Sequence, residues 1–170
     1  METKIRINVW ELLGEYKSSL HIALISDTHK LLRESVIPHL ERADLILHGG
    51  DVGNLMLWER LKAITPSLGV RGNVDKGDWS QVLPYQLEFD LYHTRIGMIH
   101  IKEEIPVDWL DQKDLILVGH SHKAEEIELS KGMILNPGSI GPRRFKLPIS
   151  MVSMRIDANG YEYEFIQFEN

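Results

Sequence analysis

The chain of 170 residues contains no cysteine, so disulfide frameworks, thiolate metal sites and cysteine nucleophiles are excluded. Nor does it have an excess of basic residues, because 19 Lys and Arg stand against 25 Asp and Glu, giving a formal net charge of −6. A long nucleic-acid track requires clustered positive charge, and we therefore expect none. A small phosphorylated substrate is compatible with this charge if a bound metal supplies local positive charge.

Long hydrophobic runs are also missing. No apolar stretch approaches the roughly 20 residues that span a bilayer, and the first 17 residues lack the apolar core and cleavage site of a signal peptide. We therefore expect a soluble, cytoplasmic protein without membrane contact. Without repeats, low-complexity tracts or linkers, the sequence predicts one domain over residues 1–170, with residues 1–19 as an N-terminal extension. The oligomeric state is not predicted.

Apolar runs and helical spacing alternate in the first half of the chain. The predicted strands are 20–26, 44–48 and 67–72, and the predicted helices between them are 31–42 and 55–64. Pro38 is expected to kink or shorten the first helix. This alternation predicts right-handed crossovers and a parallel sheet. Ile5, Ile7 and Val9 alternate as in a short edge strand.

The second half is richer in strands. Strands are predicted at 85–92, 94–100, 114–119, 124–130, 133–138, 149–156 and 161–168, and a short helix at 107–113. Asn159-Gly160 is a strong signal for a hairpin turn between the last two strands. The predicted fold is α/β, with two sheets packed face to face and flanked by helices.

Side chains that can bind metals lie at the ends of five predicted strands. They are Asp27, His29, Asp51, Asn73, His100, His120 and His122. Ligands bind beyond the carboxyl ends of strands in open α/β sheets, so these side chains are expected to meet. Oxygen and nitrogen ligands without thiolates suit Mn²⁺, Fe²⁺, Zn²⁺ or Ni²⁺. Seven ligands are too many for one ion and about right for two.

Six short segments in a fixed order strengthen this interpretation. They read SDTH (26–29), GGDVGN (49–54), RGNVD (71–75), IGMIH (96–100), GHSH (119–122) and NPGS (136–139). Together they resemble the calcineurin-like metallophosphoesterase superfamily, and within it the small single-domain bacterial and archaeal phosphodiesterases. The resemblance implies a four-layer αββα sandwich of two mixed sheets. It also implies hydrolysis of small phosphodiesters by in-line attack of a hydroxide that bridges two metal ions.

The resemblance assigns each candidate ligand a role. Asp27, His29 and His122 would bind the first ion, and Asn73, His100 and His120 the second. Asp51 would bridge two divalent transition-metal ions, Mn, Ni, Fe or Zn. Asp51 and Asn73 are accordingly also assigned to the catalytic centre, together with Lys102.

Two positions depart from the family pattern. Val74 stands where many relatives have a histidine that acts as leaving-group acid. Lys102 stands where relatives often have a second histidine after the metal-binding one. Because Lys102 follows His100 by two residues, a strand would place both side chains on one face, toward the metals. Lys102 then either contacts substrate phosphate or is solvated.

Several other residues have alternative interpretations. His48 is expected to pack or hydrogen-bond near the site rather than bind metal. Asp75 either hydrogen-bonds within its loop or assists the leaving group, and Ser139 is expected in a tight structural loop. Arg143 and Arg144 either bind substrate phosphate or form a solvated pair. The alternative functions are a catalytically weak metal-binding scaffold and a broad phosphomonoesterase.

Overall fold

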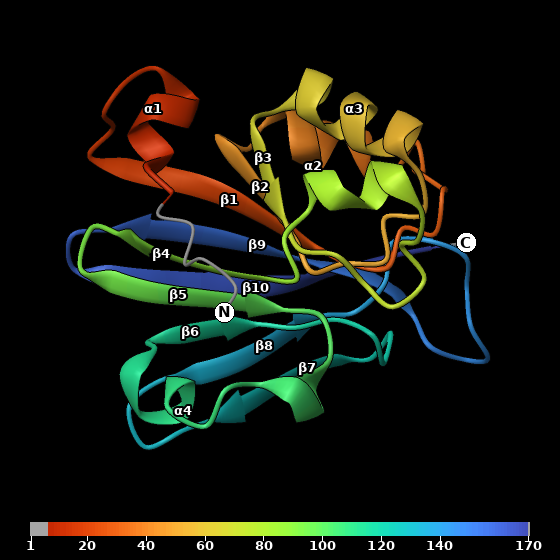
Figure 1. The fold of residues 1–170 in the computed structure, drawn as a ribbon. Helices are drawn as coiled ribbons and strands as arrows, with labels where there is room; N and C mark the ends of the chain where they lie inside the picture. Colours follow the sequence, from red (N-terminus) through yellow and green to blue (C-terminus); the bar gives the residue numbers. More distant parts are fainter. Residues whose placement is uncertain (1–6, 170) are drawn as a thin grey trace.

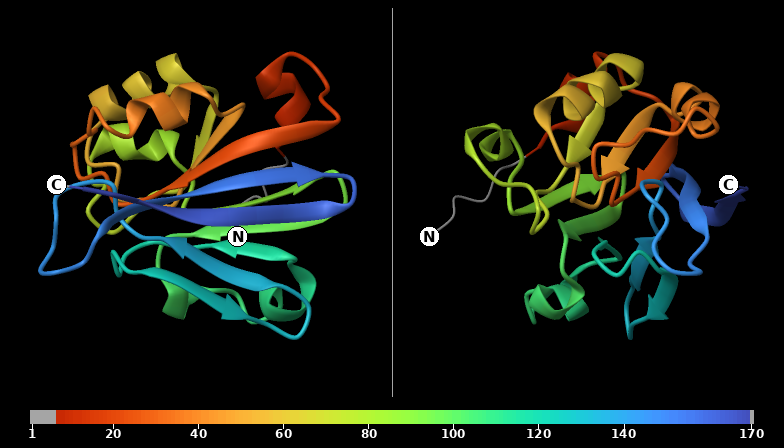
Figure 2. Two further views of the ribbon diagram at one scale, coloured as in Figure 1. Left: turned by 180° about the vertical axis from the view of Figure 1, so that it is seen from behind. Right: turned by 90° about the vertical axis from the view of Figure 1, so that its right-hand side faces the viewer.

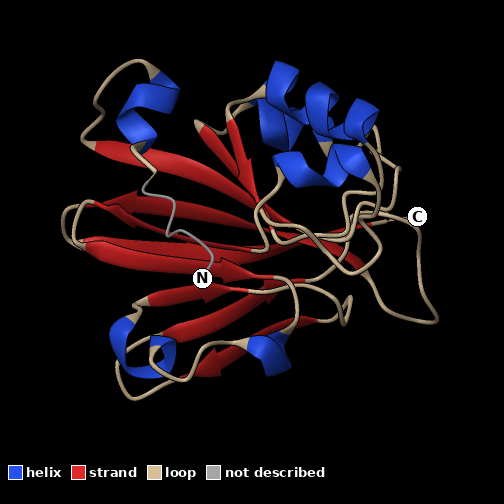
Figure 3. Cartoon of the chain, in the orientation of Figure 1, coloured by secondary structure: helices blue, strands red, loops and turns tan. Residues whose placement is uncertain are grey.

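Two five-stranded sheets pack face to face in the computed structural model, which describes residues 7–169 (Figures 1 and 3). The first sheet has the order β10 (Gly160–Phe168), β9 (Ile149–Asp157), β1 (Ser19–Ile25), β2 (Leu45–His48) and β3 (Ser67–Gly69). The second has the order β4 (Gln86–Leu91), β5 (Thr94–Ile99), β6 (Leu115–Leu117), β8 (Met133–Pro137) and β7 (Ala124–Glu128). Each sheet contains both parallel and antiparallel pairs, so both are mixed, as expected.

Helices cover the outer faces of the sheets. Helices α2 (Ile37–Glu41) and α3 (Leu55–Ile64) pack on the first sheet, and α4 (Trp109–Gln112) packs on the second (Figure 1). The other helices described are α1 (Val9–Leu13) and two short 3₁₀ helices, η1 (Asp78–Val82) and η2 (Lys102–Glu104). The predicted α/β sandwich with flanking helices is confirmed. None of the helices described is long and apolar enough to cross a membrane.

Alternating side chains build the layers of the core. Along β1, Leu20, Ile22 and Leu24 point between the sheets, whereas Ala23 and Ile25 pack under α2 and α3. This follows from the two-residue period of a strand, which sends successive side chains to opposite faces. Both faces of β1 are therefore apolar, which explains its continuous hydrophobic run.

The predicted helix at 31–42 is mostly wrong, because only Ile37–Glu41 is α-helical. Pro38 lies in the first turn, where its missing N–H costs nothing, and the helix begins there rather than six residues earlier. The predicted strand at 5–9 is also wrong at Val9, which begins α1, while Ile5 lies outside the described residues. Asn8 caps this helix by accepting a hydrogen bond from the Trp10 N–H.

The ends of the strands position the site. Strands β1, β2 and β3 run parallel, as do β5 and β6, so their carboxyl ends meet at one end of the sandwich. This end is at the right of Figure 1 and faces the viewer in the right-hand view of Figure 2. The loops that follow these strands carry the candidate ligands.

Candidate metal centre

Two groups of metal-binding side chains converge at this end. The first group is Asp27, His29 and His122, and the second is Asp51, His100 and His120. In each group the three potential ligand atoms lie within 4.8 Å of one another. Asn73 joins the second group, because its Oδ1 lies 3.0 Å from His120 Nδ1. The structure thus brings together all seven side chains that the sequence singled out.

Asp51 lies between the two groups. Its Oδ2 is 3.6 Å from His29 Nε2 in the first group and 3.3 Å from His100 Nε2 in the second. The other oxygen, Oδ1, accepts a hydrogen bond of 3.0 Å from the Val74 N–H. One carboxylate oxygen therefore faces both groups while the other is held by the backbone, as a bridging role requires.

Unpartnered buried atoms show that the groups fit cations. Among the described residues, three buried side-chain atoms lack a hydrogen-bond partner: Asp27 Oδ1, His100 Nε2 and His122 Nδ1. Leaving such groups unpaired away from water is costly, and native proteins rarely do so. All three belong to candidate ligands. Asp27 Oδ1 and His100 Nε2 face other ligand atoms, so divalent cations would satisfy two atoms that the protein leaves open. His122 faces its group through Nε2.

Hydrogen bonds to the atoms that do not face the site orient the candidate ligands. His100 Nδ1 lies 2.7 Å from the Gly49 carbonyl oxygen, so Nδ1 carries the proton and Nε2 presents a lone pair to the site. Asp27 Oδ2 accepts hydrogen bonds from Ser26 Oγ at 2.6 Å and from the His120 N–H at 3.1 Å. Ser26 thus directs Asp27 Oδ1 toward the site, a role that was not predicted although Ser26 directly precedes the ligand.

The backbone is strained at most of the ligands. Asp27, His29, Asp51, His120 and His122 all have φ between +46° and +70°. Non-glycine residues seldom adopt this conformation, and it persists where surrounding contacts impose it. Two such contacts are the hydrogen bonds from the Asp27 N–H to the Gly50 carbonyl and from the His29 N–H to the Asp51 carbonyl. Strain concentrated at one site is typical of a functional centre.

Asp75 holds two of the ligand loops together. Its buried carboxylate accepts hydrogen bonds from the N–H groups of Val52, Gly53 and Gly72, at 2.7–3.1 Å. The loops after β2 and β3 are thereby joined. Gly72 allows the close approach, since a Cβ there would lie 2.0 Å from Asp51 Oδ1. This geometry supports the structural role considered for Asp75.

The segment from Asn136 to Ser139 supports the site in the way expected of a structural loop. Asn136 Nδ2 donates to the Gly119 carbonyl at 2.8 Å, and so braces the loop that carries His120 and His122. Ser139 Oγ donates to the Asp27 carbonyl at 2.9 Å. The Ser139 hydroxyl is thus engaged with the backbone of a ligand rather than with a base.

Burial and charge set the protonation of the site. Burial alone would raise the pKa of both Asp27 and Asp51, but hydrogen bonds with the neighbouring histidines outweigh it and lower both values. Burial opposes a charge on His100, yet the carboxylates of Asp51 and Asp27 raise its pKa. Both carboxylates are therefore ionised at neutral pH, as metal ligands must be.

His48 packs beneath the site and does not face either group. The Gly50 N–H donates to His48 Nδ1 at 3.1 Å, so Nε2 carries the proton and donates to Thr28 Oγ1 at 3.0 Å. Complete burial lowers the pKa of His48 to about 3, which keeps the ring neutral. As expected, this histidine supports the loops by hydrogen bonding.

Lys102 lies in a different local structure from the one expected. Strand β5 ends at Ile99, and Lys102 begins the 3₁₀ helix η2, so the strand alternation from His100 does not hold. Lys102 Nζ forms an ion pair with Glu125 Oε2 at 3.1 Å. A role toward substrate phosphate stays a prediction, and Lys102 would have to exchange this carboxylate for the phosphate.

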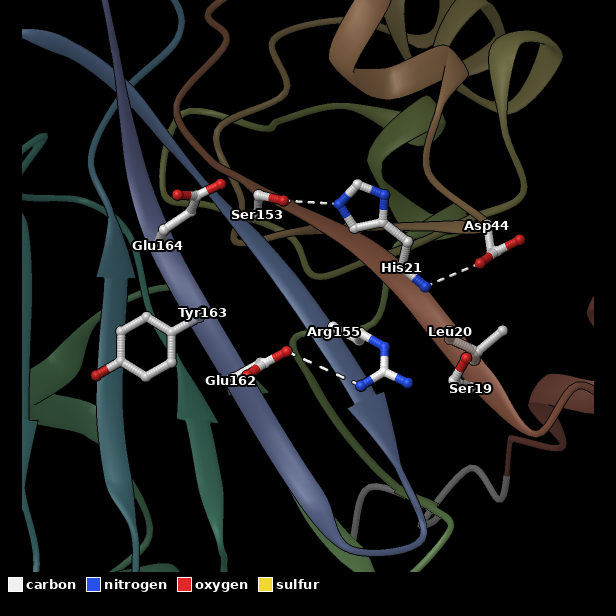
Figure 4. Close-up of a pocket in the computed structure, with 9 residues that line it drawn as sticks. All are labelled: Ser19, Leu20, His21, Asp44, Ser153, Arg155, Glu162, Tyr163 and Glu164. Atoms are coloured by element: carbon white, nitrogen blue, oxygen red, sulfur yellow. Dashed lines mark hydrogen bonds and ion pairs between the residues drawn. The ribbon is translucent and has the colours of Figure 1, made fainter.

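A groove lies away from the metal groups. This groove of about 550 Å³ lies over β1, β9 and β10 and includes His21, Asp44 and Ser153 (Figure 4). His21 Nε2 and Ser153 Oγ share a hydrogen bond of 2.6 Å. However, Asp44 accepts from the backbone N–H of His21 and not from its ring, so it does not orient the imidazole as a catalytic triad would.

Comparisons with known proteins point to one family. The family model of the calcineurin-like phosphoesterase superfamily domain matches residues 20–159. A probable metallophosphoesterase of Methanothermobacter thermautotrophicus is 32% identical over 160 residues, covering 86% of this chain and 91% of the relative.

Two solved structures share the fold at low sequence identity. One is described as a novel archaeal phosphodiesterase, with 18% identity, a TM-score of 0.68, and coverage of 87% of this chain and 99% of the other. The other is Vps29 of Entamoeba histolytica complexed with Zn²⁺, with 20% identity, a TM-score of 0.68, and coverage of 88% and 99%. At these identities the likeness concerns the fold alone.

Proposed function

The chain belongs to the calcineurin-like phosphoesterase superfamily, and from this premise we propose that it hydrolyses small phosphodiesters with two bound divalent transition-metal ions. The observation that carries the proposal is the complete ligand set, arranged in two groups with Asp51 between them. Asp27, His29 and His122 would hold one ion, and Asn73, His100 and His120 the other. The archaeal phosphodiesterase of the same fold is consistent with this choice of substrate.

The protein's own residues hold and orient the reacting groups. When bound, two cations lower the pKa of a water molecule and neutralise phosphate oxygens. Asp51 would contribute to the binding of both ions, and the backbone N–H of Val74 holds its other oxygen in place. Valine at position 74 supplies no proton to a leaving group. We therefore expect esters with good leaving groups to react much faster than those with poor ones.

Two alternatives remain testable against this proposal. A metal-binding scaffold without catalysis is favoured by Val74, which cannot act as an acid, and by the ion pair that engages Lys102. A phosphomonoesterase would use the same ligands. A hydrolysis assay separates them: bis(p-nitrophenyl) phosphate and p-nitrophenyl phosphate are compared with Mn²⁺, Ni²⁺, Fe²⁺ or Zn²⁺, with and without chelator. We expect metal-dependent turnover that is faster for the diester; no turnover with any metal would favour the scaffold.

Metal loading is expected to reach two ions per chain. The reason is that two groups of potential ligand atoms converge, and that Asp27 Oδ1 in the first and His100 Nε2 in the second are buried without a hydrogen-bond partner. Elemental analysis after incubation with Mn²⁺ or Ni²⁺ and removal of free metal measures the stoichiometry. Binding should also raise the melting temperature, because a ligand that binds only the folded state stabilises it. A protein that retains no stoichiometric metal would contradict the assignment.

Replacing Lys102 with alanine tests its predicted contact with substrate. If Lys102 exchanges Glu125 for a phosphate oxygen, kcat/KM for phosphodiesters should fall about 5- to 150-fold, equivalent to about 1–3 kcal/mol for a charge-assisted hydrogen bond. Metal stoichiometry should not change. Lys102→His restores the residue found in relatives and tests whether the missing ring limits the rate. Glu125→Gln is the matched control, because it frees the lysine without removing it, and unchanged kinetics in all three variants would exclude Lys102 from the reaction.

A further inference from the structure

An exposed arch follows the buried loop that supports Asp27. The arch is residues 142–146, Pro-Arg-Arg-Phe-Lys, and all five residues are exposed, whereas Gly141 before it and Ile149 after it are buried. The right-hand view of Figure 2 shows this segment, in light blue, beside the carboxyl ends of the strands. The arch therefore rises at the rim of the metal centre and not on a remote face.

The base of the arch is fixed against the first group of ligands. Gly141 lies so close to the Asp27 carbonyl that a Cβ there would be 2.2 Å from its oxygen. Arg33 donates from Nε and Nη2 to the Gly141 carbonyl at 3.1–3.2 Å. The Ser150 N–H closes the loop by donating to the Ser139 carbonyl at 3.0 Å. Four residues beyond Gly141 reach at most about 14 Å, so position 145 stays within that distance of Gly141.

The cations of the arch have no partners among the residues that the structure describes. The side chains of Arg143, Arg144 and Lys146 form no hydrogen bond or ion pair with any residue in the range 7–169. By contrast, Lys102 and Lys113 each pair with a glutamate. Three uncompensated positive charges in a chain of net charge −6 make the arch attractive to an anion.

Phe145 is exposed to an unusual extent. The residue is 93% exposed, and its φ is +52°. An aromatic ring in water beside guanidinium groups is the arrangement by which proteins bind nucleobases, through stacking on the ring and charge on the phosphates. Arginine also matches phosphate geometry with two parallel hydrogen bonds, which lysine does not.

We infer that the arch is a binding site for nucleotide phosphodiesters that carry a second phosphate, with Phe145 stacking on a base and Arg143 and Arg144 binding the second phosphate. The inference rests on the proposed function, because the reacting phosphate would lie at the metal centre. The arch would thus turn a general phosphodiester site into one that prefers short, phosphorylated nucleotides.

A matched pair of substrates tests the arginines. A thymidine dinucleotide with a 5′-phosphate carries the second anion, and the same dinucleotide without it does not. We expect the wild-type protein to prefer the phosphorylated form by about 10- to 100-fold in kcat/KM. Arg143→Ala/Arg144→Ala should abolish this preference and leave hydrolysis of bis(p-nitrophenyl) phosphate unchanged. Lys62→Ala/Lys131→Ala is the control, since it removes two exposed positive charges elsewhere.

The stacking contact is tested with an abasic analogue of the phosphorylated dinucleotide. Phe145→Ala should lower kcat/KM for the dinucleotide by about 5- to 100-fold, the range of base stacking, and leave the abasic analogue unaffected. Calorimetric binding of phosphorothioate-linked versions of all three compounds gives a readout that does not require turnover. We expect the phosphorylated dinucleotide to bind more tightly than either other compound. The arginine variant should remove the effect of the 5′-phosphate, and Phe145→Ala should remove the effect of the base.

The outcomes distinguish this inference from the proposed function. Binding that depends on the 5′-phosphate and on the arch, without hydrolysis of any ester, would support the site and refute the proposed function. Hydrolysis of bis(p-nitrophenyl) phosphate, with equal kcat/KM for the dinucleotides with and without the 5′-phosphate, would support the proposed function and overturn the inference. Equal losses in the arginine variant and in the lysine control would likewise overturn it, because only net charge would then matter.

Discussion

Asp51→Asn is expected to lower kcat/KM for phosphodiesters by about 10³-fold or more, equivalent to about 4 kcal/mol of transition-state stabilisation. The size of the effect follows from the position of one oxygen. Asp51 Oδ2 lies 3.6 Å from a histidine of the first group and 3.3 Å from a histidine of the second, so one change weakens the binding of both ions. Metal stoichiometry should fall from two ions to one or fewer.

Asparagine is the informative replacement because it preserves shape. Its Oδ1 can still accept the hydrogen bond from the Val74 N–H, so the loop should keep its conformation. Elemental analysis and kinetics on the same preparation measure the two effects, and circular dichroism verifies the fold. Asp44→Asn is the control, since Asp44 pairs with Lys17 away from the metal groups. Normal metal content and turnover in Asp51→Asn would refute the bridging assignment.

The convergence of the candidate ligands could be predicted from the sequence because each of them lies within a few residues of the end of an apolar strand. Strand ends are marked by a change from aliphatic residues to glycine, and parallel strands bring their ends together. The division into two groups came from the family resemblance, and the distances around Asp51 agree with it. Residue type and order therefore carried most of the information about the site.

Features that depend on a few local dihedral angles could not be predicted. The stretch 31–36 has apolar residues at helical spacing, yet it is a loop, because the backbone after Asp27 is held by pairing with the segment 50–52. Lys102 was expected on a strand face, but the strand ends at Ile99 and a 3₁₀ helix begins at Lys102 itself. In both cases tertiary contacts at the site override the local pattern.

The residues that support the ligand loops could not be predicted from the sequence either. Ser26, Asp75 and Asn136 hold the ligand loops through hydrogen bonds to backbone atoms or to a ligand. No spacing rule predicts these contacts. Those of Asp75 with Gly53 and of Asn136 with Gly119 join segments that the fold brings together, and that of Ser26 with the adjacent Asp27 depends on side-chain orientation. For Asp75, the sequence left two roles open, and they differ in what a substitution should do.

Asp75→Ala is expected to destabilise the protein by about 3–5 kcal/mol. The substitution leaves the N–H groups of Val52, Gly53 and Gly72 without their acceptor, and Asp75 itself is only 4% exposed. For a chain of this size the melting temperature should fall by roughly 6–20 °C. The measurement is made in chelator, so that metal binding does not add its own stabilisation. Asp78→Ala, which removes an exposed carboxylate three residues away, should change the melting temperature little.

Kinetics with a series of leaving groups separates the structural role from a role in proton transfer. If Asp75 only joins the loops, the fully metal-loaded Asp75→Ala protein should lose rate by a similar factor for every phosphodiester. If Asp75 assists the leaving group, the loss should grow as the leaving group becomes more basic, because a poor leaving group depends most on a proton. The three hydrogen bonds of its carboxylate favour the first result, together with the fall in melting temperature. A loss that rises with leaving-group basicity and an unchanged melting temperature would assign Asp75 to the reaction.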